Sequence, residues 1–524
     1  MRRRKSLFLL LIFLFYIPVL AQVDTAWVRR YNGPGNSEDH AYALSVDSSG
    51  NVYVTGWSPG SGTGLDYATI KYSPSGDTLW VKRYNGPGNG SDYAYALAVD
   101  GSGNVYVTGW SYGSGSSSDY ATIKYSPAGD TLWVRRYNGP GNSYDYATAL
   151  AVDSSGNLYV AGYSDSDTSS FFNYDYATIK YSPSGDTVWV RRYNGPGNSD
   201  EEASALAVDD SGNVYVTGQS DGSGSSSDYA TIKYSPSGDT LWVRRYHGPG
   251  NGTDYAYALA VDGSGNVYVT GSSNGSGTFR DYATIKYNSA GDTLWARRYN
   301  GTGNDWDLAN ALAVDDSGNL YVTGYSDGSG TSYDYATIKY SPSVDTLWVR
   351  RYHGPGNYVD FASALAVDDS GNLYVTGQSY GSGSSYDYAT IKYSSAGDAL
   401  WVRGYNGPGN DGDGAYALAV DGSGNVYVTG QSYGSGTDYD YATIKYIQFA
   451  CVAKPGDANS DGNVTLPDII YLVNRVFKGG PAPTPLCRGD ANADGNVTLP
   501  DIIYLVNRVF KGGPTPLKSK ECCL

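Results

Sequence analysis

The stretch DYAYALAVDGSGNVYVTGWSYGSGSSSDYATIKYSPAGDTLWVRRY, residues 92–137, decides the fold, because it returns with small changes along most of the chain. Four parts of it, 92–100, 105–109, 119–125 and 131–137, alternate in polarity and are rich in Val, Ile, Thr, Tyr and Trp. This pattern predicts four strands, and the helical period is absent. Glycine, proline and asparagine between the runs are typical of turns.

The copies follow one another at a nearly constant period. A tryptophan marks the fourth strand of each copy, at intervals of 53 residues with one of 56: Trp27, Trp80, Trp133, Trp189, Trp242, Trp295, Trp348 and Trp401. A unit of four short strands at this period predicts the blade of a β-propeller rather than a helical repeat. A β-solenoid is the alternative, although a four-strand unit is long for it.

The two ends of the repeat region carry complementary strands. The first strand, 25–31, is a lone fourth strand, and the eighth copy stops after its third strand, 440–446. An open stack would leave both edges unpaired, which favours aggregation, whereas a closed ring pairs them. The sequence therefore predicts an all-β, eight-bladed propeller over 22–446, closed by the N-terminal strand.

The repeats resemble a bacterial β-propeller repeat family, the SBBP type, whose signature is D-x-x-G-N-x-Y-V-T-G. The motif stands here as DSSGNVYVTG at 47–56 and returns in all eight copies, with Ala161 replacing threonine once. The resemblance covers about 420 residues and implies the propeller scaffold, but it attaches no reaction to the motif.

The N-terminus and the net charge indicate an exported protein. Four basic residues, 2–5, precede an apolar run at 7–20, so we expect a signal peptide over 1–21 and a mature chain from Gln22. The alternative is a membrane anchor, but the run falls short of the roughly 20 residues that span a bilayer. A net charge of −16 argues against nucleic acid and anionic membranes as partners.

The segment 456–514 carries the sharpest chemical signal. It holds two copies of a 12-residue pattern in which Asp and Asn alternate around a glycine, as in loops that give Ca²⁺ six to eight oxygen ligands. The predicted ligands of two Ca²⁺ ions are Asp457, Asn459, Asp461, Asn463 and Asp468, and Asp490, Asn492, Asp494, Asn496 and Asp501. An amphipathic helix follows each loop, the first with one predicted stripe of Ile469, Ile470, Leu472, Val473, Val476 and Phe477.

These two units resemble a type I dockerin, a module that attaches an enzyme or binding protein to a cohesin on a scaffold or cell surface. The copies at 456–481 and 489–514 differ only at Ser460 and Ala493, so the module would present equivalent faces after a half turn. Leu466-Pro467 and Leu499-Pro500 stand where many dockerins carry a Ser/Thr pair, which puts the choice of cohesin in doubt. The alternative is a calcium-stabilised cap without a partner.

Four cysteines lie in or beside this module: Cys451, Cys487, Cys522 and Cys523. An even number in a small exported domain predicts disulfides, with three possible connectivities. Antiparallel packing of the two units favours pairing Cys451 with Cys522 or Cys523, and a zinc site is the alternative. The predicted order is a signal peptide (1–21), the propeller (22–446), a linker (447–455), the dockerin-like module (456–514) and a cysteine-containing tail (515–524).

The propeller offers two candidate binding features. One acid begins the innermost strand of each copy: Asp39, Asp92, Asp145, Glu201, Asp254, Asp307, Asp360 and Asp413. These acids would either ring the mouth of the channel and attract a cation or basic ligand, or accept backbone N–H groups to hold a turn, and the turn role is favoured. The YNGPGN loops and the Gly/Ser stretches share the face on which we expect binding. Aromatic residues that vary there are candidate sugar contacts: Trp57, Trp110, Tyr112, Trp306 and Tyr433.

Support for catalysis is weak. Of the three histidines, His40, His247 and His353, the last two replace the asparagine of YNGPGN, and no nucleophile breaks the near-identity of the copies. We therefore expect a secreted, non-catalytic binding or display protein that docks on a cohesin-like partner and presents a glycan- or protein-binding face. The alternative is a dockerin-borne propeller hydrolase that uses two carboxylates on a polysaccharide.

Overall fold

The computed structural model describes residues 23–115, 117–166, 173–222, 226–328, 332–356, 358–383, 385–448, 456–459, 463–483, 488–492, 496–514 and 516. Two compact units make up the chain, one over 25–447 and one that includes 448–524. The predicted signal peptide, the four cysteines and two predicted calcium ligands, Asp461 and Asp494, lie outside the described residues. None of the helices in the described ranges is long and apolar enough to cross a membrane.

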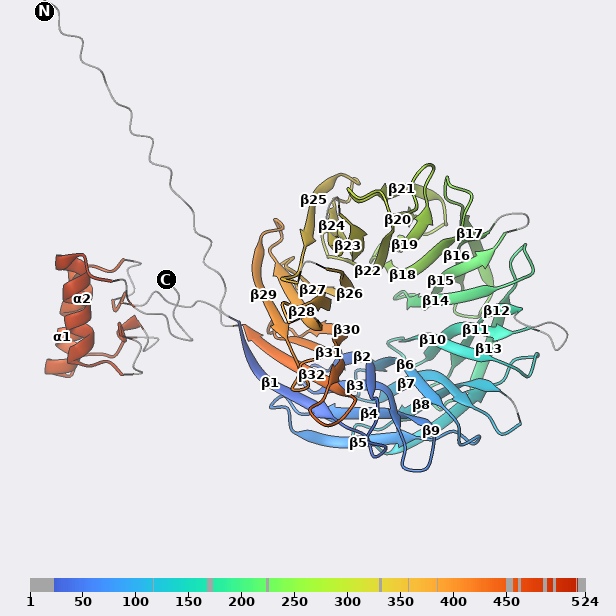
Figure 1. Cartoon of the computed structure of the whole chain (residues 1–524), viewed down its shortest axis with the longest axis horizontal. Helices are drawn as coiled ribbons and strands as arrows, with labels where there is room; N and C mark the ends of the chain where they lie inside the picture. Colours follow the sequence, from blue (N-terminus) through green and yellow to red (C-terminus); the bar gives the residue numbers. More distant parts are fainter. Residues whose placement is uncertain are drawn as a thin grey trace, which may run out of the picture. The chain divides into compact units, whose positions relative to one another are not determined.

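The larger unit is a ring of eight four-stranded sheets arranged as propeller blades, with the first strand of each blade nearest the axis (Figure 1). Blades 1 and 2 consist of β2 (His40–Val46), β3 (Val52–Pro59), β4 (Leu65–Tyr72) and β5 (Thr78–Tyr84), and β6 (Asp92–Val99), β7 (Val105–Tyr112), β8 (Ser118–Tyr125) and β9 (Thr131–Tyr137). Blades 3 and 4 consist of β10 (Asp145–Val152), β11 (Leu158–Asp165), β12 (Tyr174–Tyr181) and β13 (Thr187–Tyr193), and β14 (Glu201–Val208), β15 (Val214–Asp221), β16 (Ser227–Tyr234) and β17 (Thr240–Tyr246).

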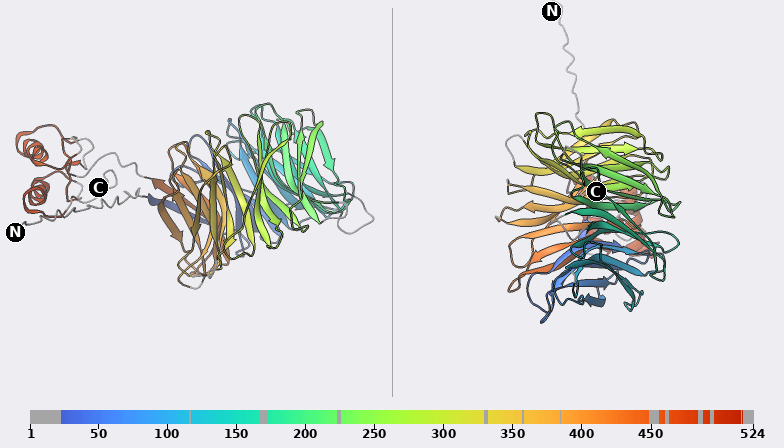
Figure 2. Two further views of the ribbon diagram at one scale, coloured as in Figure 1. Left: turned by 90° about the horizontal axis from the view of Figure 1, so that it is seen from above. Right: turned by 90° about the vertical axis from the view of Figure 1, so that its right-hand side faces the viewer.

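The next three blades repeat the same order. Blade 5 consists of β18 (Asp254–Val261), β19 (Val267–Asn274), β20 (Arg280–Tyr287) and β21 (Thr293–Tyr299). Blade 6 consists of β22 (Asp307–Val314), β23 (Leu320–Asp327), β24 (Tyr333–Tyr340) and β25 (Thr346–Tyr352). Blade 7 consists of β26 (Asp360–Val367), β27 (Leu373–Tyr380), β28 (Tyr386–Tyr393) and β29 (Ala399–Tyr405). Seen from the side, the strands run between the two faces of the ring (Figure 2).

Blade 8 joins the two ends of the repeat region. Its strands are β30 (Asp413–Val420), β31 (Val426–Tyr433), β32 (Tyr439–Gln448) and, as the outermost strand, β1 (Val23–Tyr31). Arg30 of β1 forms an ion pair with Asp440 of β32, with Nη2 to Oδ2 at 2.8 Å. The predicted eight-bladed propeller, closed by the N-terminal strand, is confirmed, and the open solenoid is excluded.

The D-x-x-G-N motif forms the tight turn between the first and second strands. Asp100 accepts hydrogen bonds from the backbone N–H groups of Ser102 and Asn104 through Oδ1, and from Asn104 Nδ2 and the Tyr106 hydroxyl through Oδ2. Gly103 has a φ of 79°, in the left-handed region that favours glycine. The motif is therefore a turn that the aspartate and glycine stabilise together, which explains its return in every blade.

Aromatic side chains connect each blade to the next. Between blades 2 and 3, the Tyr120 hydroxyl donates to the Ala177 carbonyl at 3.1 Å and Trp133 Nε1 donates to the Pro183 carbonyl at 3.3 Å. Tyr120 is fully buried and Trp133 is 8% exposed, in one cluster with Tyr106 of blade 2 and with Tyr181 and aliphatic residues of blade 3. Most of the regularly spaced tyrosines and the marker tryptophans are therefore core residues of the blade junctions.

The smaller unit contains two helices, α1 (Leu466–Lys478) and α2 (Leu499–Lys511). Asp468 accepts a hydrogen bond from the backbone N–H of Thr465 at 2.7 Å and thereby caps the start of α1, which ends at Gly479 with a φ of 67°. The core consists of Ala458, Ile469, Leu472, Ala491, Ile502 and Leu505. The single predicted stripe is wrong in part, because Ile470 and Phe477 are 52% and 62% exposed.

Candidate functional site

The two predicted calcium loops place buried carboxylates before each helix and in its first turn. Asp457 and Asp468 are 1% and 0% exposed in the first loop, and Asp490 and Asp501 are 4% and 0% exposed in the second. The same pattern in both copies agrees with their near-identical sequences. Burial of several carboxylates in so small a unit is unfavourable unless a cation or hydrogen bonds compensate for the lost hydration.

The donor chemistry of these loops fits calcium. The described ligand candidates are all oxygen donors, namely Asp457, Asn459, Asn463 and Asp468, and Asp490, Asn492, Asn496 and Asp501. Asp468 Oδ1 accepts a hydrogen bond from the backbone N–H of Asn459 at 3.1 Å, which holds position 12 of the loop against position 3. The second loop repeats this contact between Asp501 and Asn492 at 3.2 Å. Each loop is thus already folded back on its helix.

The eight acids at the start of the inner strands are buried in the blades, at most 2% exposed. Seven accept a hydrogen bond from the backbone N–H of the first glycine in the preceding loop at 2.6–2.7 Å: Asp39, Asp92, Asp145, Asp254, Asp307, Asp360 and Asp413. Glu201 takes the same place and accepts from Ser220 Oγ at 3.3 Å. These contacts fit the turn role, and none of these eight carboxylates is exposed at the channel mouth.

Burial has a clear electrostatic effect on these acids. It raises the pKa of Asp39, Asp145 and Asp307 to about 6, and that of Glu201 to about 7. Hydrogen bonds from glycine N–H and serine hydroxyl groups oppose the effect without cancelling it.

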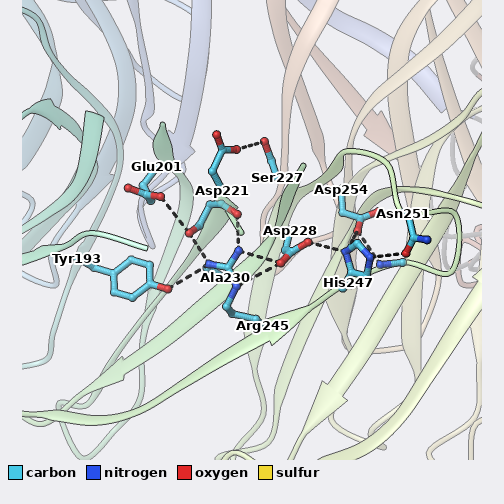
Figure 3. A network of polar contacts seen from close by, with 12 residues as sticks. Tyr193, Glu201, Asp221, Ser227, Asp228, Ala230, Arg245, His247, Asn251 and Asp254 are labelled. Atoms are coloured by element: carbon cyan, nitrogen blue, oxygen red, sulfur yellow. Dashed lines mark hydrogen bonds and ion pairs between the residues drawn. The ribbon is translucent and has the colours of Figure 1, made fainter. Parts of the chain in front are cut away.

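A second acid, from the third strand of the preceding blade, lies near each of these carboxylates and pairs with an arginine. Figure 3 shows the group at blade 4, where Arg245 Nη2 lies 2.9 Å from Asp228 Oδ2 and Arg245 Nη1 donates to the Tyr193 hydroxyl of blade 3 at 3.3 Å. The same ion pair joins Arg30–Asp440, Arg83–Asp66, Arg136–Asp119, Arg192–Asp175, Arg298–Asp281 and Arg351–Asp334 at 2.8–3.0 Å. Sequence reasoning missed this network, although its residues recur at fixed positions.

Blade 7 is the exception, because Gly404 occupies the position of the arginine. Burial raises the pKa of Asp387 to about 6, and the nearby Asp413 contributes. Oδ1 of Asp387 is buried and receives no hydrogen bond from the described residues. The change from WVRRY to WVRGY in the fourth strand was the available signal for this defect.

His247 and His353 each lie between the acids of two blades. His247 Nδ1 lies 2.7 Å from Asp228 Oδ1 and 4.0 Å from Asp254 Oδ2, and Nε2 lies 2.8 Å from Asn251 Oδ1 (Figure 3). His353 repeats the arrangement with Asp334 and Asp360. In each group the three candidate ligand atoms lie within 4.8 Å of one another, close enough to share a proton or a metal ion.

Cavities between neighbouring blades open on the face of the tight turns. One of about 440 Å³, between blades 1 and 2, is lined by Asp47, Asn51, Lys71 and Asp100, among others, and equivalents of about 370 and 320 Å³ lie between blades 6 and 7 and between blades 3 and 4. The binding face predicted from the sequence was the opposite one, with the long loops. There, Tyr112 and Trp306 are 43% and 42% exposed, whereas Trp57 is buried in β3.

Solved structures match the chain at low similarity. The chain is 12% identical to the polysaccharide lyase Uly1, with a TM-score of 0.44 over 78% of this chain and 90% of that one. It is 12% identical to an alpha-L-arabinofuranosidase from Fusarium graminearum, with a TM-score of 0.34 over 59% and 95%. Likeness at this level carries no argument about activity.

An uncharacterised WD repeat-containing protein of Acanthamoeba polyphaga mimivirus is 25% identical over 450 residues. The match covers 69% of this chain and spans about a third (31%) of that protein's length.

Two family descriptions match the chain directly. Beta-propeller repeats match at residues 26–62, 79–115, 132–167, 188–224, 241–277, 294–330 and 347–383. A dockerin type I domain matches at 455–510, over both calcium loops and both helices, and dockerin type I domains bind calcium. The chain is thus a beta-propeller repeat protein of the SBBP type that carries a C-terminal dockerin type I domain.

Proposed function

We propose that this chain is a secreted, non-catalytic binding protein that docks through its dockerin domain on a cohesin-type partner and presents a binding face on its propeller. The observation that carries the proposal is the pair of loops whose ligand candidates are oxygen donors with buried carboxylates, each leading into a helix with exposed apolar residues. Loops of this kind need calcium to fold, and the exposed residues need a partner to cover them.

Two calcium ions would hold the loops, one in each. Asp457, Asn459, Asn463 and Asp468 would bind the first together with Asp461, and Asp490, Asn492, Asn496 and Asp501 would bind the second together with Asp494. The metal would neutralise the buried carboxylates and fix the start of each helix.

The docking surface would consist of apolar residues that the two helices expose in equivalent positions. Leu466, Ile470 and Phe477 of α1 are 46%, 52% and 62% exposed, and Leu499, Ile503 and Phe510 of α2 have the same values. Large apolar side chains at this exposure, duplicated on two helices, are typical of a protein interface. Since the two sets are equivalent, a cohesin could bind either helix.

Binding of a set of recombinant type I cohesins to the full chain tests this function. We expect calcium-dependent binding that EGTA abolishes and that the double substitution Asp468→Ala with Asp501→Ala removes, while Asp100→Ala, which affects a propeller turn, leaves it intact. Phe477→Ser with Phe510→Ser, which alters only exposed residues, should weaken binding without unfolding the helices. If no cohesin is retained in calcium, the docking function is wrong.

The alternative is a propeller hydrolase carried by the same dockerin. It is favoured by one observation, the half-buried Glu202, whose pKa is raised by burial and then by Asp200 and Asp221. A carboxyl group of raised pKa is what a general acid requires. Release of reducing sugar from a polysaccharide by the wild type, and its loss in Glu202→Gln, would establish the alternative over the non-catalytic function.

A further inference from the structure

Two facing positions on the two inner strands of each blade vary strongly from blade to blade. The first is the residue that follows the buried acid at the start of the innermost strand, and the second is its cross-strand partner on the next strand of the blade. In order from blade 1 to blade 8 they are His40/Trp57, Tyr93/Trp110, Tyr146/Tyr163, Glu202/Gln219, Tyr255/Ser272, Leu308/Tyr325, Phe361/Gln378 and Gly414/Gln431. All lie at the long-loop end of the strands nearest the axis. The blades therefore differ at this end of their inner strands, while the buried tyrosines and the turn residues repeat.

In blades 1 to 3 these residues form a continuous row of aromatic rings. Centroids lie 4.2 Å apart for His40–Trp57, 5.4 Å for Trp57–Tyr93 and 4.3 Å for Tyr93–Trp110. The row continues with Trp110–Tyr146 at 5.3 Å and Tyr146–Tyr163 at 5.1 Å. We call these six residues the aromatic row. It passes from blade to blade along one side of the ring.

The aromatic row differs from the structural aromatics of the blades in its exposure. Tyr53, Tyr67 and their equivalents are fully buried and occur in every blade, as core packing requires. All members of the row except Trp57 are only half-buried, and blades 4 and 8 fold with Glu202/Gln219 and Gly414/Gln431 at the same positions. Packing of the scaffold therefore does not require these rings.

Aromatic and polar side chains both lie deeper along the inner strands. Ring centroids of Tyr42 lie 5.5 Å from those of Tyr95 and Tyr416, and these rings extend the aromatic surface. At the equivalent position blade 5 carries Tyr257, whereas blades 3, 4, 6 and 7 carry the small polar residues Thr148, Ser204, Asn310 and Ser363. An aromatic platform next to hydroxyl, amide and carboxyl groups suits a ligand with apolar faces and a hydroxyl-rich edge, which is the chemistry of a pyranose.

The charge of the side chains around the aromatic row favours uncharged sugar chains over anionic ones. His40 is the only basic residue of the sixteen, and burial lowers its pKa to about 4, so it is neutral at physiological pH. Glu202 adds a carboxyl group beside Tyr163, and the chain carries a net charge of −16. Such a surface repels polyanions and admits uncharged chains.

We propose that the aromatic row binds a neutral polysaccharide chain, whose sugar rings stack on Trp110, Tyr93 and Tyr146 while Glu202 and Gln219 accept or donate hydrogen bonds at the end of the row. The inference rests on the proposed function of the propeller as a binding face, and it names the site and the class of ligand.

Isothermal titration calorimetry of the full chain in calcium tests the site, with cellohexaose, xylohexaose and mannohexaose as neutral probes and an oligogalacturonate as the anionic one. We expect binding of at least one neutral probe and a Kd weakened about tenfold or more in Trp110→Gln. Glutamine is the matched replacement, because Gln219, Gln378 and Gln431 occupy the equivalent position in other blades. Tyr325→Gln, at the same position in blade 6, is the control and should leave the Kd unchanged.

Tyr163→Gln is the second variant within the row and should weaken binding as well, with melting temperatures of all variants recorded alongside. Absence of binding to every neutral probe, preference for oligogalacturonate, or equal Kd values for Trp110→Gln and Tyr325→Gln would each overturn the proposal. Asp468→Ala with Asp501→Ala should keep oligosaccharide binding while cohesin binding is lost. A failure of this site is thereby distinguished from a failure of the docking function.

Discussion

Each junction between two blades buries several large aromatic side chains, as with Tyr106, Tyr120 and Trp133, whereas the core of the dockerin domain consists of six residues, two of them alanines. Hydrogen bonds between neighbouring blades pair many of the buried polar groups of the propeller, with tyrosine and tryptophan donating to the next blade and arginine to the preceding one. The dockerin domain buries at least four carboxylates, to which the chain offers backbone N–H groups and one ion pair, between Arg488 Nη1 and Asp457 Oδ2 at 2.7 Å. The propeller is therefore expected to be stable alone, and the dockerin domain only with its metal.

Chelation of calcium is expected to have the largest effect and to distinguish the stability of the dockerin domain from that of the propeller. We expect EGTA to unfold α1 and α2, because the buried carboxylates repel one another without a cation, and to leave the propeller folded. Far-ultraviolet circular dichroism would show loss of the helical signal, and near-ultraviolet circular dichroism would show an unchanged tyrosine and tryptophan environment. Loss of both signals together would mean that the units are not independent.

Within the propeller, the buried and exposed residues of one strand provide a second comparison. Trp133 is 8% exposed and Leu132, its neighbour in β9, is 52% exposed. We expect Trp133→Ala to lower the free energy of unfolding by about 3–5 kcal/mol and Leu132→Ala to change it by less than about 0.5 kcal/mol. Urea denaturation of the two variants measures both values, and similar losses would contradict the assignment of the junction core.

A substitution in blade 7 is expected to raise the free energy of unfolding, by less than Trp133→Ala lowers it. The Cβ of a residue at 404 would meet only the Tyr388 carbonyl oxygen, at 3.6 Å, so Gly404→Arg has room to restore the ion pair that the other blades have. We expect a gain of about 1–2 kcal/mol in the free energy of unfolding at pH 7, after a discount for solvent screening at this partly exposed site. Arg136→Gly, which creates the same defect in blade 2, should lose a similar amount.

The pH dependence of this gain follows from the sign of the pKa change. The pKa of Asp387 is raised from 3.8 to about 6, so the folded state binds the proton more tightly than the unfolded state. Its unfavourable contribution is therefore absent below about pH 4 and complete above about pH 6. Gly404→Arg should stabilise more at pH 7 than at pH 4, which urea denaturation at both pH values can check. An equal gain would show that Asp387 is not the cause.

The sequence predicts the fold well because repetition multiplies the signal. The same turn occurs in eight copies, in one of which Asp100 and Gly103 stabilise it, and its position marks where the first two strands of each blade begin and end. The strands left without a partner at the two ends, β1 and β32, predict that the ring closes by pairing them. The calcium loops were equally readable, because ligand chemistry requires Asp and Asn at fixed spacing.

Other features depend on contacts that no single repeat contains. The pair Asp228–Arg245 lies within one blade, but Tyr193 and Asp254 come from its two neighbours, so the network forms only when adjacent blades pack together. The stripe on α1 was wrong in part for a similar reason. Packing of two helices over a short loop buries Ile469 and Leu472 and leaves Ile470 exposed, although all three are apolar.

The smallest expected effect on stability concerns His247 and His353, which follow the last strands of blades 4 and 6. The other blades carry asparagine at this position. The pKa of His247 is raised above 6.5, first by its hydrogen bond with Asn251 and then by Asp228, so the folded state favours the charged imidazole. Its stabilising contribution is therefore complete below about pH 6 and is lost as the pH rises through the folded pKa. Because the ring is 38% exposed, we expect His247→Asn to cost only a few tenths of a kcal/mol at about pH 5 and almost nothing at about pH 8.

Thermal denaturation at the two pH values measures the difference, with Asn138→His as the reciprocal variant in blade 2. If His247→Asn costs more at the higher pH, the imidazole acts in its neutral form and the charged bridge between Asp228 and Asp254 is wrong.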